Sequence, residues 1–261
     1  MPSRPGARYR VATVTVLVVR DLKRLLRQPS RLAGAIGQPL VFWLVLGGGF
    51  AGTFHLPGAP VGYLEYFYPG VLAMVVLFSA IFGAMSLIED RREGFLQAVL
   101  AGPGSRASVA LGKILGGSAV ALLQALVFLA LAPWAGFEPA TIAWGPLLAL
   151  LALAALALTG VGFALAWWID STQGYHAVVS LLLIPLWVLS GAMFPAAGSV
   201  LSTLMRLNPV AYVVDGLRRA LYGGLVPATV GLESSLSLDI AMAGAFAIMA
   251  FAAAAVVCRR R

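Results

Sequence analysis

The sequence predicts an all-α integral membrane protein with six transmembrane helices. Hydrophobic residues make up 61% of its 261 residues, charged residues only 11%, and the mean hydropathy is +0.93. Soluble globular domains carry about 25% charged residues. The apolar residues are also gathered into six stretches, most of them close to the roughly 20 residues that a helix needs to cross a bilayer. Most of the chain is therefore expected to be solvated by lipid.

The six expected spans follow one another along the whole chain. They cover about residues 33–54, 67–88, 107–132, 142–169, 176–194 and 240–257. Prolines fall inside three of them, which a membrane bundle tolerates because neighbouring groups satisfy the freed carbonyls. We expect residues 1–32 to form an N-terminal segment, residues 33–257 a single transmembrane domain and residues 258–261 a basic tail.

The positions of Lys and Arg predict which side each loop faces, because short cytoplasmic loops are enriched in both. Fifteen of the 18 basic residues lie before the first span, between residues 91 and 113, or in the last three residues. If the chain crosses the membrane six times, these three regions lie on the same side of it. We therefore expect both termini to be cytoplasmic. Basic residues beside apolar spans favour membrane lipids with anionic headgroups as their partner, and not nucleic acid.

The N-terminal segment has the pattern of a basic amphipathic helix. Its basic residues recur at helical spacing, and its valines and leucines fall mostly on the other side; the basic set is Arg20, Lys23, Arg24, Arg27 and Arg31. Such a helix lies in the plane of the membrane interface. A signal peptide with residues 11–19 as its apolar core is the alternative, but this core is short and charges follow it at once.

A charged segment separates the second and third spans. Its charged residues are Glu89, Asp90, Arg91, Arg92, Glu93, Arg106 and Lys113. Within it, an apolar stripe runs over two helical turns and consists of Phe95, Leu96, Val99 and Leu100. Gly102-Pro103-Gly104 breaks this short cytoplasmic helix, and Ser105 can cap the next one. The helix either lies on the headgroups or serves as a docking surface; its acidic residues favour docking, because only Lys and Arg set topology.

A second short helix is expected in the long connection between the fifth and sixth spans. Asn208 and Pro209 suit an N-cap and a first helical position. Asp215 and Arg219 are spaced i,i+4 on its polar side, with Arg218 beside them, and a pair of glycines ends it. We expect a re-entrant or interfacial helical hairpin at the outer leaflet. It either fills the interface or forms a plug or gate at an exit.

The sequence lacks the groups that would power transport or catalyse a reaction. The spans hold almost no ionisable residue away from their ends, whereas ion-coupled carriers keep a charge relay inside the bilayer. The nearest approach to a phosphate loop has Ala107 where a glycine is required and Ile114 after the lysine. Cys258, His55 and His176 are too few and too far apart for a zinc site. We expect no catalytic, cofactor-binding or metal-binding residue here, so energy must come from another chain.

Three stretches together match the pattern of one family. They are "EDRREGFLQAVLAGPGSRASVALGK" (89–113), "LSGAMFP" (189–195) and "LNPVAYVVDGLRRALYGG" (207–224), in the family's order. The chain resembles the permease subunits of type-2 ABC exporters, of the drug-resistance and nodulation group that includes daunorubicin-exporter permeases. It departs at residues 94–97, where Gly-Phe-Leu-Gln stands for a frequent Gly-Thr-Leu-Glu.

The resemblance implies one half of a pore, completed by a second copy or a paralogue. Two copies of a separate ABC ATPase would bind ATP and Mg²⁺ and drive an amphipathic, lipid-like, drug or glycan substrate out of the cell. The ATPase would dock on the basic N-terminal helix and on the helix after the second span. There, residues 89–93 would make polar contacts, and the apolar stripe would fill a groove on the ATPase. The outer hairpin would line the exit. A non-transport membrane scaffold and an ion-coupled carrier are the alternatives.

Overall fold

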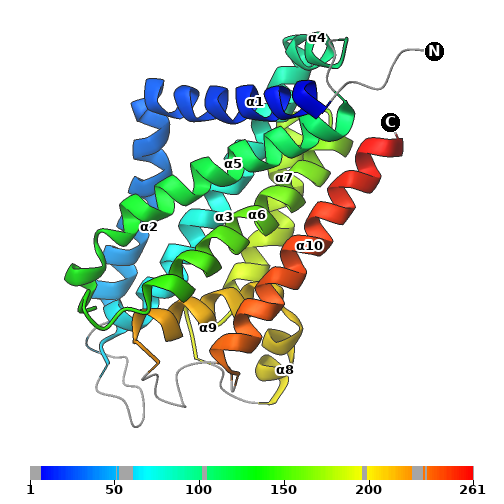
Figure 1. Ribbon diagram of the computed structural model, residues 1–261. Helices are drawn as coiled ribbons and strands as arrows, with labels where there is room; N and C mark the ends of the chain where they lie inside the picture. Colours follow the sequence, from blue (N-terminus) through cyan, green and yellow to red (C-terminus); the bar gives the residue numbers. More distant parts are fainter. Residues whose placement is uncertain are drawn as a thin grey trace.

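The protein is a bundle of long helices in a computed structural model, and the regular structure of its described residues is helical (Figure 1). The structure describes residues 7–50, 52, 61–101, 105–195, 199–224, 232 and 234–260. The expected turn at residues 102–104 and His55 lie outside these residues. The bundle helices are α2 (Pro29–Phe50), α3 (Tyr63–Arg92), α5 (Arg106–Leu129), α6 (Trp144–Trp168), α7 (Thr172–Val188) and α10 (Leu236–Arg260).

Among the described residues, five of these helices are long and apolar enough to cross a membrane, and α7 is a shorter apolar helix. The prediction of a helical membrane protein is thereby confirmed, while the fifth expected span corresponds to the 17-residue α7. The helix bounds also differ from the expected ones. Helix α3 continues to Arg92, so the first charges of the charged segment form its last turn. Helix α10 continues to Arg260, so the expected tail is largely helical.

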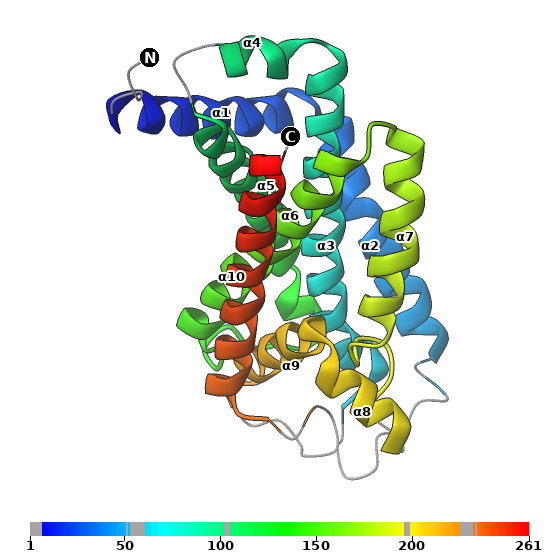
Figure 2. The same cartoon turned by 90° about the vertical axis from the view of Figure 1, so that its right-hand side faces the viewer.

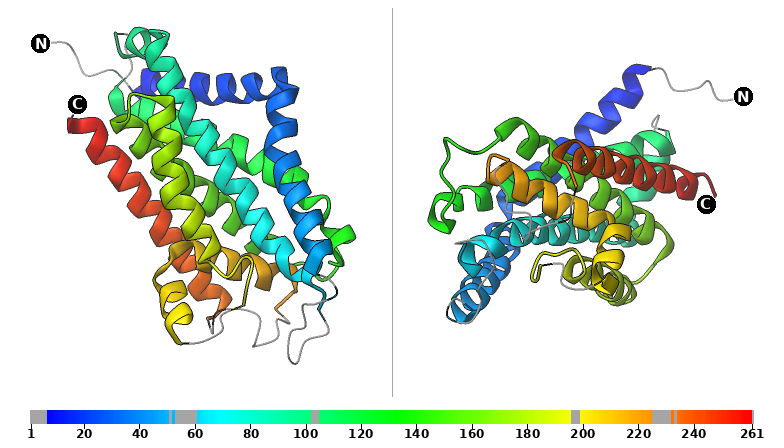
Figure 3. Two further views of the ribbon diagram at one scale, coloured as in Figure 1. Left: turned by 180° about the vertical axis from the view of Figure 1, so that it is seen from behind. Right: turned by 90° about the horizontal axis from the view of Figure 1, so that it is seen from below.

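Helix α3 is the central element of the bundle. It packs on α5, α6 and α2, and seen from behind it lies between α2 and α7 (Figure 3). Most of its residues are buried, because α2, α5, α6, α7 and α9 pack around it. The outer helices instead expose apolar side chains, among them Val45 on α2, Leu181 on α7 and Ile248 on α10. A bilayer would cover such surfaces.

Three short helices and one long one lie at the ends of the bundle. Helix α1 (Ala7–Arg27) crosses one end, with α4 (Phe95–Ala101) beside it (Figure 2). We name this the charged end; it also holds the start of α5 and the last turn of α10. Helices α8 (Ser199–Leu207) and α9 (Pro209–Leu221) lie at the opposite end, the α9 end. A 3-10 turn, η1 (Ala132–Ala135), follows α5.

Candidate functional site: a charged cluster beneath the N-terminal helix

Helix α1 packs directly on α5 because glycines leave room for it. A Cβ atom at Gly112 would lie 2.9 Å from the Cδ1 atom of Leu17 and 3.2 Å from the Cα atom of Val14. A Cβ atom at Gly116 would lie 2.7 Å from a carboxylate oxygen of Asp21. Small residues at helical spacing permit this kind of close approach. The crossing brings the polar side of α1 over the ends of α3 and α5.

A group of charged side chains meets at this crossing, and we call it the charged cluster. It consists of Arg20, Asp21 and Arg24 from α1, Glu89 and Asp90 from α3, and Lys113 from α5. Three of the six residues are acidic and three are basic, so the charges balance. A balanced set of ion pairs reduces the cost of holding charge near the apolar part of a bundle.

Asp90 is the centre of the charged cluster and is fully buried. The guanidinium group of Arg20 donates to both of its carboxylate oxygens, with 3.0 Å between Nη1 and Oδ2. The ammonium group of Lys113 lies 2.5 Å from Oδ2. A two-pronged contact with an arginine fixes the orientation of a carboxylate as well as its charge. Asp90 therefore ties α3 to both α1 and α5.

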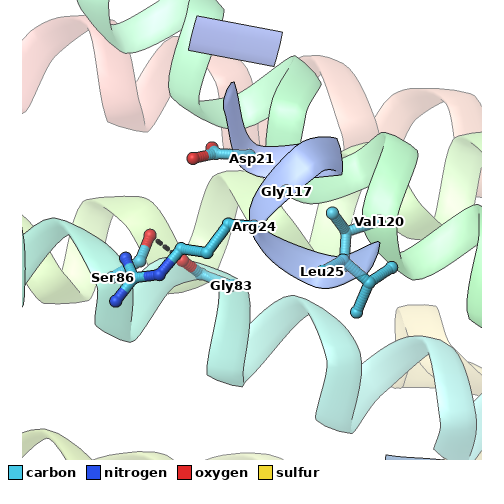
Figure 4. A pocket seen from close by; sticks show the side chains of 7 residues that line it. All are labelled: Asp21, Arg24, Leu25, Gly83, Ser86, Gly117 and Val120. Carbon is cyan, nitrogen blue, oxygen red and sulfur yellow. Dashed lines mark hydrogen bonds between the residues drawn. The ribbon is translucent and has the colours of Figure 1, made fainter. Parts of the chain in front are cut away.

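Asp21 approaches Lys113 from the other side, at 3.4 Å. Burial raises the pKa of Asp21 above its ordinary value, although the charges of Lys113 and Arg20 act in the opposite direction. A cavity of about 30 Å³ adjoins this carboxylate, and Figure 4 shows the residues that line it, which include Arg24, Gly83 and Ser86. This volume is enough for a single water molecule.

Further contacts extend the charged cluster to the neighbouring elements. Arg24 pairs with Glu89 at 2.9 Å. Arg91 pairs with Asp170 in the turn between α6 and α7. The Arg20 guanidinium also stacks on the ring of Phe95 at 3.8 Å from the centroid, which joins α4 to the same group. The cluster thus connects α1, α3, α4, α5 and the α6–α7 turn.

These contacts correct part of the expected docking surface. Asp90 was expected among its polar contacts, but it is buried within the chain because Arg20 and Lys113 enclose it. Leu96 was expected to fill a groove on a partner, but it belongs to the hydrophobic core, and Phe95 and Val99 pack against that core. The stripe faces inward because α4 packs against α3 and α5. The side chain of Leu100 lies outside the described set.

The remaining expected residues lie on the outside of the charged end. Arg92 and Glu93 are exposed on the link into α4, as are Lys23 and Arg27 on α1. The backbone around them follows the expected pattern. Gly94 has a φ of +75° and separates α3 from α4, and Ser105 caps α5 by accepting from the N–H of Ser108 at 3.1 Å.

Sequence reasoning did not single out Asp21 or Asp170 as members of the site. One signal was available for Asp21, because Lys113 lies two turns inside a span and a charge there requires a partner. Asp21 is also the only acidic residue before the first span. Which acid would meet which base depends on the crossing of α1 over α5. The spacing of Gly112 and Gly116 permits a close helix approach but does not show which helix makes it.

Helix α9 was expected as a re-entrant or interfacial helix, and the structure adds that its polar side is buried. Asn208 caps α9 as expected, by accepting from the N–H of Val210 at 3.0 Å, and Pro209 is its first residue. Asp215 and Arg218, however, are each only 1% exposed. The helix is buried because α3, α6 and α10 pack around it.

The polar side of α9 is satisfied by a second ionic group. Arg219 lies 3.0 Å from Asp215 and 3.3 Å from Asp239 of α10, and it donates to the carbonyl oxygen of Leu232 at 2.6 Å. Arg218 lies over the ring of Tyr66, 4.6 Å from its centroid. These contacts join α9 to α10 and α3.

The fold and the two ionic groups define a class: multi-pass helical membrane proteins whose buried charges tie helices together at the two ends of the bundle. The model of the ABC-2 type transporter family matches residues 12–222, and the chain belongs to this family. It is a non-catalytic transmembrane permease subunit of an ABC-2 type transporter, and permeases of this family pair with ATPase subunits.

Several relatives are similar to this chain over most of its length. The putative transport permease ycf38 of Cyanophora paradoxa is 29% identical over 209 residues, which cover 78% of this chain and 72% of the relative. Nodulation protein J of Neorhizobium galegae is 28% identical over 213 residues, covering 76% of this chain and 77% of the relative. The putative transport permease ycf38 of Pyropia yezoensis is 24% identical over 217 residues, which cover 80% of this chain and 73% of the relative.

Proposed function

We propose that this permease belongs to an ATP-driven exporter of the bacterial cytoplasmic membrane, with its charged end in the cytoplasm. The basic residues support this orientation. The charged end holds most of the lysines and arginines of the described residues, whereas the α9 end holds Arg206, Arg218 and Arg219. Short loops rich in Lys and Arg face the cytoplasm.

The ATPase docks, in this proposal, on the outer face of the charged end. The exposed residues there are Arg92, Glu93, Gln97 and Ala98 around α4, with Lys23 and Arg27 on α1. Mixed charges on a short, well-anchored helix suit a specific protein contact, because complementary charges fix the register of two surfaces. ATP and Mg²⁺ are bound by the ATPase and not by this chain.

The charged cluster is the observation that carries this proposal. A push on α4 or α1 reaches α3 through Asp90 and reaches α5 through Lys113, because these side chains are buried and paired. Packed interfaces switch between discrete arrangements and do not bend continuously. Closure of an ATPase pair on the charged end would therefore move two spans together.

A second permease copy or a paralogue completes the transporter in this proposal. The apolar side chains exposed on α2 and α7, the two helices that flank α3, give it a surface; Val45 and Leu181 are examples. The cargo is an amphipathic, lipid-like, drug or glycan molecule that leaves past the α8–α9 region.

The docking proposal is tested without knowledge of the cargo. The tagged chain is purified in mild detergent from cells that contain its ATPase, and the amount of ATPase that co-purifies is measured. We expect the double variant Arg92→Glu, Glu93→Lys to lose the ATPase, because it reverses two exposed charges beside α4 while leaving the buried Asp90 in place.

The matched control is Glu138→Lys, which reverses an exposed charge in the connection between α5 and α6. It should retain the ATPase. Both variants must elute from a sizing column as the unaltered chain does. Full ATPase recovery with the double variant would show that the ATPase binds elsewhere.

A further inference from the structure

A groove of about 240 Å³ lies between the start of α5 and the end of α10 at the charged end. It shares no residue with the charged cluster, and neither α1 nor α4 lines it. Its walls are built mainly from Arg106, Ala110 and Ile114 of α5 and Phe251, Ala254 and Cys258 of α10. Ligand pockets for small molecules begin at about 300 Å³. The groove therefore suits one narrow apolar group better than a bulky solute.

The groove exists because α10 packs chiefly on α6 and only lightly on α5. Alanines on both walls leave the space between α5 and α10 unfilled. On its outer side, α10 exposes Ile248, Met249 and Phe251. The groove thus opens towards the surface that a bilayer would cover, and an apolar chain can enter it from the side.

One basic residue stands at the mouth of this apolar groove. Arg106 is exposed, and within the described part of the chain it makes no ion pair. It is also the first residue of α5, where the aligned peptide dipoles and free N–H groups of a helix favour an anion. The sequence adds two arginines in the last turn of α10, at positions 259 and 260.

An apolar groove with a positive mouth has the polarity of an anionic phospholipid. We infer that it binds one such lipid from the leaflet at the charged end. The phosphate lies at Arg106 and the first turn of α5, and an acyl chain follows Ile114, Phe251 and Ala254. Positive residues beside membrane spans attract the anionic lipids of the cytoplasmic leaflet. The lipid would join α5 to α10 where the protein itself joins them only lightly.

The chain contains a built-in probe for this site. Cys258 is its only cysteine, and it lines the groove. The rate at which N-ethylmaleimide alkylates Cys258 is measured on the full-length chain in detergent, with increasing phosphatidylglycerol or with phosphatidylcholine of the same acyl chains. We expect phosphatidylglycerol to slow alkylation at amounts at which phosphatidylcholine does not, and inorganic phosphate alone to have no effect.

Arg106→Gln tests the headgroup contact. It should increase the phosphatidylglycerol needed for half protection about fivefold, the contribution of one basic residue beside an anionic lipid. The matched control is Arg10→Gln, an exposed arginine of α1 at the same end but outside the groove. In this variant, phosphatidylglycerol should protect Cys258 as well as it does in the unaltered chain. Equal protection by both lipids, or no effect of Arg106→Gln, would overturn the inference.

Ala255→Leu tests the acyl-chain contact, because Ala255 also lines the groove and is only half-buried. Native mass spectrometry should show that it retains less phosphatidylglycerol than Ala252→Leu, on the exposed face of α10. Equal retention would contradict the proposed path.

If protection of Cys258 instead increased with protein concentration and not with lipid, a second copy would cover the groove and the lipid proposal would be wrong. None of these outcomes depends on ATPase docking.

Discussion

The ammonium group of Lys113 and the carboxylate of Asp90 lie 2.5 Å apart, and their side chains are only 4% and 0% exposed. One belongs to α5 and the other to the last turn of α3, so the ion pair joins two spans inside the bundle. Arg20 of α1 donates to both oxygens of the same carboxylate. This three-way contact makes an otherwise costly charge near the apolar part of α5 acceptable.

Lys113→Met should destabilise the protein strongly. It keeps the length of the side chain but leaves Asp90 with Arg20 alone and Asp21 without its nearest base. Breaking a buried ion pair by removing one partner costs about 3–5 kcal/mol. Thermal unfolding of the purified chain in detergent measures the effect.

Asp90→Asn combined with Lys113→Met should cost less than the two single changes together, because the pair is then removed as a unit. Glu138→Gln, an exposed change at the other end, is the control and should leave the unfolding temperature unaltered. A Lys113→Met protein as stable as the unaltered chain would show that the ion pair contributes nothing.

Gly112→Ala should loosen α1 from α5. The added Cβ atom would meet the backbone of Val14 at 3.2 Å, and backbone cannot move aside as a side chain can. Overpacking of this kind costs about 1–3 kcal/mol. Hydrogen exchange of the α1 backbone should become faster.

The comparison for this change is Gly37→Ala in α2, where nothing lies within 4 Å of the added atom. It should be neutral or stabilise the chain by up to about 1 kcal/mol, because alanine is the better helix former. Unchanged exchange of α1 in the Gly112→Ala protein would mean that α1 is not seated at this glycine.

Arg219→Met should destabilise the junction of α9 and α10. It removes the guanidinium group that lies between the carboxylates of Asp215 and Asp239, which are almost fully buried. Two buried acids left close together with one weaker partner, Arg218 at 3.8 Å, should cost about 3–5 kcal/mol. Hydrogen exchange of α9 and the unfolding temperature report the change.

Asp239→Asn should restore part of the stability lost in the Arg219→Met protein, because it removes one of the two opposed charges. Arg10→Met on α1 is the matched control, since that arginine is exposed. If Arg219→Met and Arg10→Met behaved alike, the ionic contact would not hold α9 against α10.

The sequence predicted those features of the fold that depend on local composition. Apolar length gave the spanning helices to within a few residues, and the cap at Ser105 and the end of α9 at Gly223, with φ of +60°, follow local chemistry. The burial of α9 could not be predicted in the same way. The partners that cover its polar side, Asp239 and the carbonyl of Leu232, come from a later part of the chain.

The candidate site was predicted only in outline for the same reason. Its place in the chain followed from the charges between the second and third spans. The roles within it depend on tertiary contacts, since Asp90 faces inward only because α1 crosses α5 above it. An amphipathic pattern shows that a helix has two faces, but it does not show which face another helix covers.

Asp21→Asn should make the protein slightly more stable at neutral pH. Burial raises the pKa of Asp21. A carboxyl group whose pKa is higher in the folded than in the unfolded protein contributes fully to stability at pH values below its unfolded pKa. This contribution is lost as the pH rises through the folded pKa. At neutral pH the charged form of Asp21 therefore opposes folding, and an asparagine of the same shape avoids this cost. Its advantage over the unaltered chain should shrink as the pH falls, because Asp21 then becomes protonated.

Thermal unfolding across a pH series measures the difference, with Glu138→Gln as an exposed control that should show no such trend. An Asp21→Asn protein that is less stable than the unaltered chain at neutral pH would show instead that the attraction of Lys113 and Arg20 outweighs burial.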